Sequence, residues 1–105
     1  MGKLVYGSPG TEIELDDRLL THLKMAMIAK LRRDEKFTLS WSLAQEDGGG
    51  RRTIWVHPAI PLEFIFYGSK QPVLNREWIE ALMASANSTG GLQLVEEPPT
   101  SGTAG

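Results

Sequence analysis

The strongest constraint on the fold of this chain is a short block of strict alternation. Residues 37–43 read Phe-Thr-Leu-Ser-Trp-Ser-Leu, so apolar and hydroxyl side chains exchange places at every position. Successive side chains of a β-strand point to opposite faces, and this period of two therefore predicts a half-buried strand. Such a strand needs neighbouring strands and a layer of other elements over its apolar face.

Further strand patterns stand on both sides of this block. The segments Lys3–Tyr6 and Thr11–Leu15 flank a Gly-Ser-Pro-Gly turn and predict a β-hairpin. After a glycine-rich loop, Thr53–His57 reads as the return strand, and Leu62–Tyr67 follows two prolines as the next one. Three strands in succession predict an antiparallel meander.

Two amphipathic segments predict helices. Asp16 is a good N-cap for a helix that runs to about Arg33, and Asn75 is one for a helix over about Arg76–Ala86. In the first helix the apolar stripe is formed by Leu20, Leu23, Met27 and Leu31, which places His22 on the polar side. A last short strand is expected at 92–95.

The resulting order, β-β-α-β-β-β-α-β, predicts an α+β fold. We expect two layers, a mainly antiparallel sheet with both helices packed on one face. Residues 1–95 then form a single domain. Residues 96–105 are rich in Pro, Gly, Ser and Thr without an apolar anchor, so we expect a disordered C-terminal tail.

Composition narrows the classes of function. None of the 105 residues is cysteine, which excludes disulfides, thiolate nucleophiles and zinc–thiolate sites. The first residues lack the apolar core of a signal peptide, and apolar stretches are too short to span a bilayer. We therefore expect a cytoplasmic protein with no membrane partner.

The sequence contains no recognisable catalytic motif. The two histidines have no metal-ligand spacing, no serine sits in a Gly-x-Ser-x-Gly elbow, and the glycines lack phosphate-loop spacing. We accordingly predict no catalytic residues, no metal and no cofactor, and an enzyme is the least favoured class.

Basic residues support one binding hypothesis. Arg32, Arg33 and Lys36 follow the first helix, and Arg51 and Arg52 open the return strand. If they converge, their guanidinium and ammonium groups could bind the phosphates of a nucleic acid. The net charge of −2 lends this hypothesis no support, because phosphate binding usually rests on a basic excess.

Aromatic residues support the hypothesis that we favour. If the helices cover the apolar sheet face, the opposite face keeps a mixed polar and aromatic surface that includes Trp55, His57, Ile65 and Tyr67. Exposed aromatic patches often mark partner sites. The sequence therefore favours a non-catalytic interaction module that binds a protein partner or itself as a homo-oligomer, with an accessory nucleic-acid-binding protein as the alternative.

Three blocks together resemble a known family. They are the opening residues 2–10, the stretch Ile54–Leu62, and residues 74–83, which read Leu-Asn-Arg-Glu-Trp-Ile-Glu-Ala-Leu-Met. They are similar to a family of short actinobacterial proteins that forms a domain of unknown function, whose members often carry the automatic label ATP-dependent DNA ligase. The resemblance spans roughly residues 1–98 and implies no site residues. No lysine here stands in the Lys-x-Asp-Gly motif of such ligases.

Overall fold

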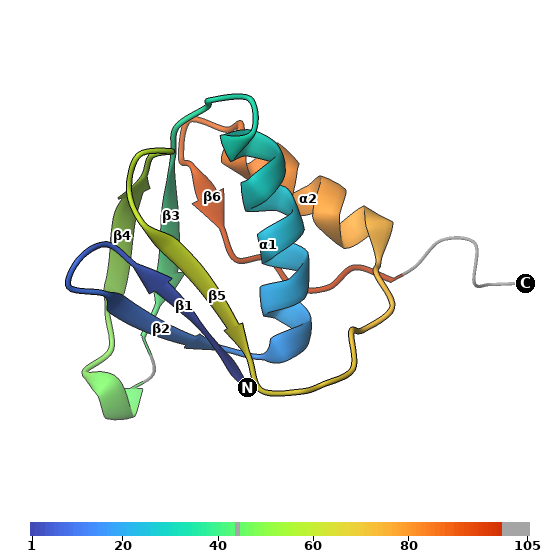
Figure 1. The fold of residues 1–105 in the computed structure, drawn as a ribbon, viewed down its shortest axis with the longest axis horizontal. Coiled ribbons are helices and arrows are strands. Elements are labelled where there is room, and N and C mark those ends of the chain that lie inside the picture. Colours follow the sequence, from blue (N-terminus) through green and yellow to red (C-terminus); the bar gives the residue numbers. More distant parts are fainter. Residues whose placement is uncertain (44, 100–105) are drawn as a thin grey trace, which may run out of the picture.

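The computed structural model of the chain describes residues 1–43 and 45–99, and it confirms the α+β class and the predicted order of elements (Figure 1). A single 3₁₀ turn at Gln45–Asp47 lies between the third and fourth strands. The strands and helices are β1 (Gly2–Tyr6), β2 (Thr11–Leu15), α1 (Asp17–Leu31), β3 (Phe37–Ser42), β4 (Arg51–Val56), β5 (Leu62–Phe66), α2 (Arg76–Ala86) and β6 (Leu92–Gln93).

The strands form two small sheets. The first sheet has the order β2-β1-β5 and is antiparallel throughout; the second has the order β4-β3-β6, in which β6 runs parallel to β3. The predicted meander is therefore right for β3 and β4 and wrong for β5, which pairs with β1. Pro58 and Pro61 explain the break, because proline supplies no ladder donor and both stand in the segment that joins β4 to β5.

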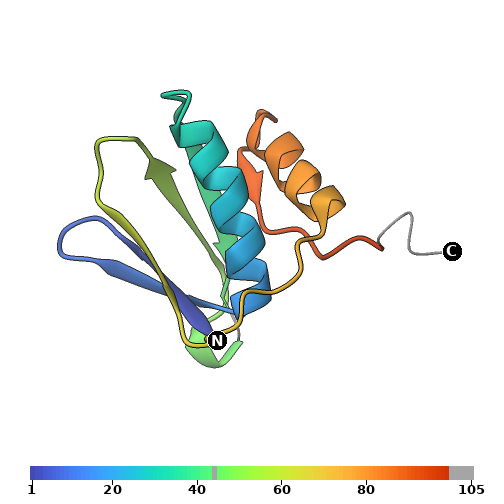
Figure 2. The ribbon, with the colours of Figure 1, turned by 45° about the vertical axis from the view of Figure 1, so that its right-hand side comes forward.

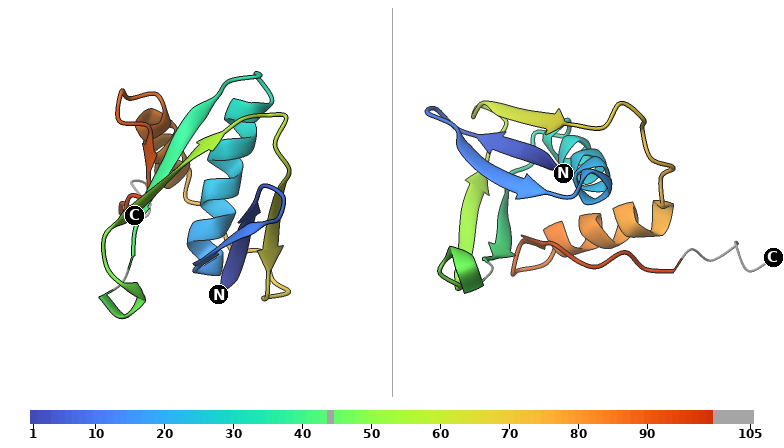
Figure 3. Two further views of the ribbon diagram at one scale, coloured as in Figure 1. Left: turned by 90° about the vertical axis from the view of Figure 1, so that its left-hand side faces the viewer. Right: turned by 90° about the horizontal axis from the view of Figure 1, so that it is seen from below.

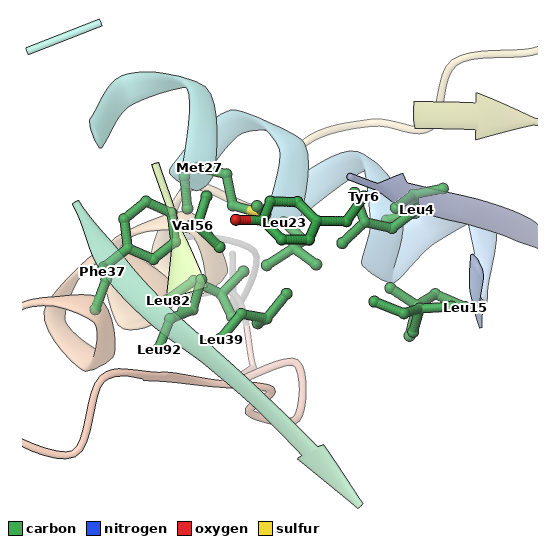
Figure 4. Packing of buried hydrophobic residues seen from close by; sticks show 14 of the residues in the cluster. Leu4, Tyr6, Leu15, Leu23, Met27, Phe37, Leu39, Val56, Leu82 and Leu92 are labelled. Carbon is green, nitrogen blue, oxygen red and sulfur yellow. The ribbon is translucent and has the colours of Figure 1, made fainter. Parts of the chain in front are cut away.

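Helix α1 lies between the two sheets and packs against β1 and β5, while α2 lies beside α1 and covers β3 and β6 (Figures 2 and 3). Apolar side chains from every layer meet in one core: Leu4 from the first sheet, Leu23 and Met27 from α1, Leu39 from the second sheet and Leu82 from α2 (Figure 4). Both sheets thus share one hydrophobic core.

Both predicted helix caps are present. The Asp16 carboxylate accepts from the backbone N–H groups of Arg18 and Leu19, and the Asn75 side chain accepts from Glu77 and Trp78. Each cap satisfies amide groups that have no partner inside the first turn of a helix. Within the described ranges, neither helix is long and apolar enough to cross a membrane.

One side chain joins the two sheets. Tyr6, at the end of β1, is buried and donates its hydroxyl to the backbone carbonyl of Trp55 on β4. Burial raises the pKa of Tyr6, which keeps the phenol in the protonated form that this hydrogen bond requires. The hydroxyl therefore satisfies a carbonyl that points away from the β3–β4 ladder.

Candidate functional site

The outer edge of β5 carries unpaired backbone groups. Gly7 donates its N–H to the carbonyl of Pro61 at 3.0 Å, which fixes the hydrogen-bonding phase of the β1–β5 ladder. Residues opposite each other in an antiparallel pair alternate between bonded and non-bonded pairs. Glu63 and Ile65 therefore bond to β1, and the residues whose N–H and C=O groups point outward are Leu62, Phe64 and Phe66.

No strand lies beyond this edge among the described residues, as Figure 3 shows from below. Two separate hollows lie beside α1, one next to β5 and one next to the loop that follows it. The first, of about 390 Å³, is apolar apart from Arg32 and is lined by Ile28 and Leu31 of α1 together with Leu62 and Phe64. The second, of about 180 Å³, lies past the end of β5. It is lined by Phe66 and the loop residues 68–72 on one side and by Asp17, Thr21, Lys24 and Met25 on the other. We call this pair of hollows the α1–β5 groove.

The edges of β2 and β4 carry groups that disfavour the addition of a further strand. The same alternation turns the backbone of Glu12 and Glu14 outward on β2, and both carboxylate side chains are exposed. On β4 it turns Arg51, Thr53 and Trp55 outward, and Tyr6 already occupies the Trp55 carbonyl. Charged side chains and covering contacts are devices that keep strand edges from pairing. Strand β5, by contrast, has a single charged residue, Glu63, and four large apolar ones.

The four residues predicted to bind a partner do not form one patch. Trp55 and Tyr67 are exposed, at 54% and 60%, as the alternation predicts, but they belong to different sheets. Trp55 lies beside Tyr6, at the end of β1 that pairs with Leu62, and β5 then extends roughly 16 Å before Tyr67. His57 stays with Trp55 just after β4, while Ile65 and Tyr67 lie on and after β5.

The basic residues also divide into two groups. Lys36 precedes Phe37, which pairs with Val56, whereas Arg51 pairs with Ser42 at the opposite end of β3. The six residues of β3 span roughly 20 Å, so Arg32, Arg33 and Lys36 lie at one end of the second sheet and Arg51 and Arg52 at the other. Arg52 lies over the Trp41 ring, with 5.9 Å between its guanidinium carbon and the ring centroid.

The chain belongs to a family of unknown function. Its family model, described as Domain of unknown function (DUF7882), matches residues 1–97 and so covers both sheets, both helices and the α1–β5 groove. Comparison with curated proteins and with solved structures gives no match. The functional argument therefore rests on this chain's own geometry.

Helix α1 has a second neighbour on its other side, where a buried polar network joins it to α2. His22 is fully buried and stacks on Trp78 with 4.5 Å between ring centroids. The Asn75 backbone N–H donates to Nε2 of His22 at 2.7 Å, so Nδ1 carries the proton and donates to the Arg18 carbonyl at 2.7 Å. The expectation that His22 lies on a solvated helix face is therefore wrong.

The segment after β6 closes this network. Trp78 donates its indole N–H to the Val95 carbonyl at 2.9 Å, and Asn75 donates to the Glu97 carboxylate and the Pro98 carbonyl. Arg18 binds Glu97 through two nitrogens, at 2.8 and 2.6 Å, and these hydrogen bonds, with those from Asn75, hold the pKa of Glu97 at about 2. Glu97 and Pro98 are thus anchored, although we expected a tail from residue 96; residues 100–105 lie outside the described residues. We call this network with its covering segment the α1–α2 seam.

A third hollow, of about 780 Å³, opens beside the part of β3 that extends beyond the short strand β6. Its lining mixes hydroxyls of Ser40, Ser42 and Thr53 with the charges of Glu14 and Arg51. Ser40 and Thr53 bond to each other at 2.8 Å across β3 and β4. No group of three metal-ligating side chains lies here or elsewhere in residues 1–43 and 45–99.

Proposed function

We propose that this chain is a non-catalytic interaction module that takes up an extended polypeptide segment as an added strand along the free edge of β5. The observation that carries the proposal is the coincidence of an unpaired strand edge with an open groove beside it. Strand addition uses the backbone edge for affinity and neighbouring pockets for side-chain selection. The apolar hollow lies beside Leu62 and Phe64, and the second hollow lies beside Phe66.

The groove defines the chemistry of the segment. An added strand directs every second side chain toward α1, where Ile28, Leu31 and the Phe64 ring provide apolar walls. The alternate side chains join the outer face of the first sheet, beside Glu63, Ile65 and the exposed Tyr67. The preferred segment therefore alternates between apolar and polar residues and contains no proline where its N–H faces β5.

The nucleic-acid alternative receives less support from the geometry. Its five basic residues lie in two groups at opposite ends of β3, and the net charge is −2. Single-strand binders use a continuous basic groove with aromatic stacking platforms. Trp55 and Tyr67, the rings suited to stacking, also lie far apart, so neither group of cations has both rings beside it.

A direct test uses a blocked peptide in which valine and threonine alternate, titrated into ¹⁵N-labelled protein. We expect the largest amide shifts at Leu62, Phe64 and Phe66, because their N–H groups are the ones an added strand engages. The matched control is the same peptide with a central proline, which loses donors and should bind more weakly. The absence of shifts at millimolar peptide, or shifts centred on β4, would contradict the proposal.

A further inference from the structure

We infer that the segment received by β5 is the β5 strand of a second copy of this chain, so that two copies join their first sheets into one six-stranded sheet. This inference rests on the proposed function and specifies its partner. The first sheet ends at β5 on one side, and two such ends placed face to face about a two-fold axis complete each other.

Strand β5 has the side-chain pattern that its own groove selects. Leu62, Phe64 and Phe66 point toward α1 and are half-buried, and each packs against the common core. In a symmetric pair these side chains continue the apolar layer of the other copy instead of ending at solvent. Met25 of α1, which is 40% exposed and lines the groove beside Phe66, then has an apolar neighbour.

The hydrogen-bonding phase limits the register. The outward residues are even-numbered, so the bonded pairs across the axis must join even to even. An axis at Glu63 would place two carboxylates opposite each other, which is unfavourable. An axis at Phe64 engages all three outward residues of both copies, pairing Phe64 with its counterpart and Leu62 with Phe66.

This register makes a specific cross-strand neighbour. With the axis at Phe64, Glu63 of each copy lies directly opposite Ile65 of the other, in the non-bonded type of pair whose side chains approach most closely. In the same copy, Ile65 lies opposite Lys3 of β1, and Lys3 is already bonded to Glu12 at 3.0 Å. A charge at position 65 therefore meets Lys3 within its own chain and Glu63 across the axis.

Two cations of α1 lie near the ends of the paired strands. The Lys24 ammonium lies 5.7 Å from the centre of the Phe66 ring, and Arg32 lines the groove at the Leu62 end. Because the axis at Phe64 brings the Phe66 end of one copy to the Leu62 end of the other, Lys24 and Arg32 of different copies are placed at the same end. Salt screens this repulsion, while the Asp17 carboxylate, which lines the same hollow as Lys24, acts against it.

The decisive experiment measures the dimer dissociation constant of the full chain by sedimentation equilibrium. Ile65→Glu places two carboxylates opposite each other twice in the dimer and should weaken it by a factor of roughly 2 to 30, whereas Ile65→Lys should strengthen it by a similar factor. Thr53→Glu and Thr53→Lys make the same changes on the exposed edge of β4 and should leave the constant unchanged. Far-UV circular dichroism checks that each variant is folded.

A charge-reversal variant tests whether the weaker association of Ile65→Glu comes from repulsion across the proposed dimer contact or only from the loss of apolar surface. In the double variant Glu63→Lys with Ile65→Glu, opposite charges again face each other, and association should return. A wild-type chain that stays monomeric at millimolar concentration, or a dimer that both Ile65 variants weaken equally, overturns the inference. If the valine–threonine peptide still shifts the β5 amides in that case, strand addition stands and only the identity of the partner is wrong; if the peptide also fails, the proposed function fails with it.

Discussion

Helix α1 lies beside α2 on one side and beside β5 on the other, and the two sides differ in how completely their polar groups are paired. Toward α2, the α1–α2 seam is closed: His22 has partners at both ring nitrogens, and Glu97 covers the network from outside. Toward β5, the α1–β5 groove stays open, and the backbone of the strand beside it has unused hydrogen-bonding groups. A folded chain pairs its buried polar groups internally, whereas the outward backbone groups of β5 have no partner among the described residues, and this is why we place the proposed partner strand there.

Packing explains the contrast. On the α2 side, His22, Ala26 and Lys30 follow one another at intervals of four residues and are all buried. Lys30 pairs with Glu35 at 2.8 Å and donates to Asn87 at the end of α2, so even its ammonium is satisfied. On the β5 side, Met25 is exposed and Ile28 and Leu31 are only half-buried. The face of α1 toward α2 is therefore buried and its polar groups are paired, whereas the face toward β5 stays partly exposed.

Replacing a tryptophan by alanine should give the largest difference in stability between the α1–α2 seam and the exposed edge of β4. Trp78→Ala removes the ring that stacks on His22 and the donor to Val95, and it should lower the free energy of unfolding by about 3–5 kcal/mol. Trp55→Ala removes the same type of side chain from an exposed position, and it should change stability by less than about 0.5 kcal/mol. Urea unfolding of both variants tests this; equal losses would mean that the seam is not the more tightly packed region.

Substitution of the buried histidine should have an intermediate effect. His22→Leu keeps the volume approximately but leaves the Asn75 N–H without its acceptor and removes the side-chain donor to the Arg18 carbonyl, which should cost roughly 1–3 kcal/mol. Met25→Leu, on the groove side of the same helix, is a control expected to be nearly neutral. Thermal unfolding compares the two, and a neutral His22→Leu would show that the polar network contributes no net stability.

Acid should loosen the seam before it affects the groove. The folded pKa of Glu97, about 2, lies below its ordinary value of 4.5, so the bonds to Arg18 and Asn75 stabilise the fold above that ordinary value and lose their effect as pH falls toward 2. Residues 95–98 should therefore separate from α1 over this range. NMR shifts of the Trp78 indole N–H follow the change, and Glu97→Gln should abolish the pH dependence of that signal between pH 4.5 and 2.

Hydrogen exchange should show the smallest perturbation but the finest spatial detail. At protein concentrations too low for association, the amides of Leu62, Phe64 and Phe66 should exchange faster than those of Glu63 and Ile65, which bond to β1. At high concentration the difference should narrow as the edge is covered. Uniform protection along β5 in dilute protein would show that its edge is already satisfied within the monomer.

Local patterns in the sequence predicted most of the elements. Asp16 and Asn75 identified both helix starts, and the alternation in residues 37–43 assigned Leu39 inward and Ser40 outward. The partner of β5 could not be predicted in the same way, because pairing β5 with β1 joins residues about sixty positions apart and no local pattern encodes it. Proline at 58 and 61 was the available signal that β5 leaves its sequence neighbour.

The candidate site was only partly accessible from the sequence. Ile65 was among the predicted partner-binding residues and lies on β5, but the groove itself depends on where α1 packs, which periodicity does not reveal. The burial of His22 was missed because one apolar stripe was assumed to define one buried face. A helix with neighbours on two sides buries two stripes, and the spacing of His22, Ala26 and Lys30 is the signal that could have revealed the second.

The hydroxyl of Tyr6 ties the first sheet to the second. It donates to the Trp55 carbonyl, an acceptor on β4 that faces away from β3, and so links the end of β1 to a strand of the other sheet. Tyr6→Phe would keep the ring in the core but remove this link. A single oxygen atom therefore helps to set the angle at which the two sheets meet.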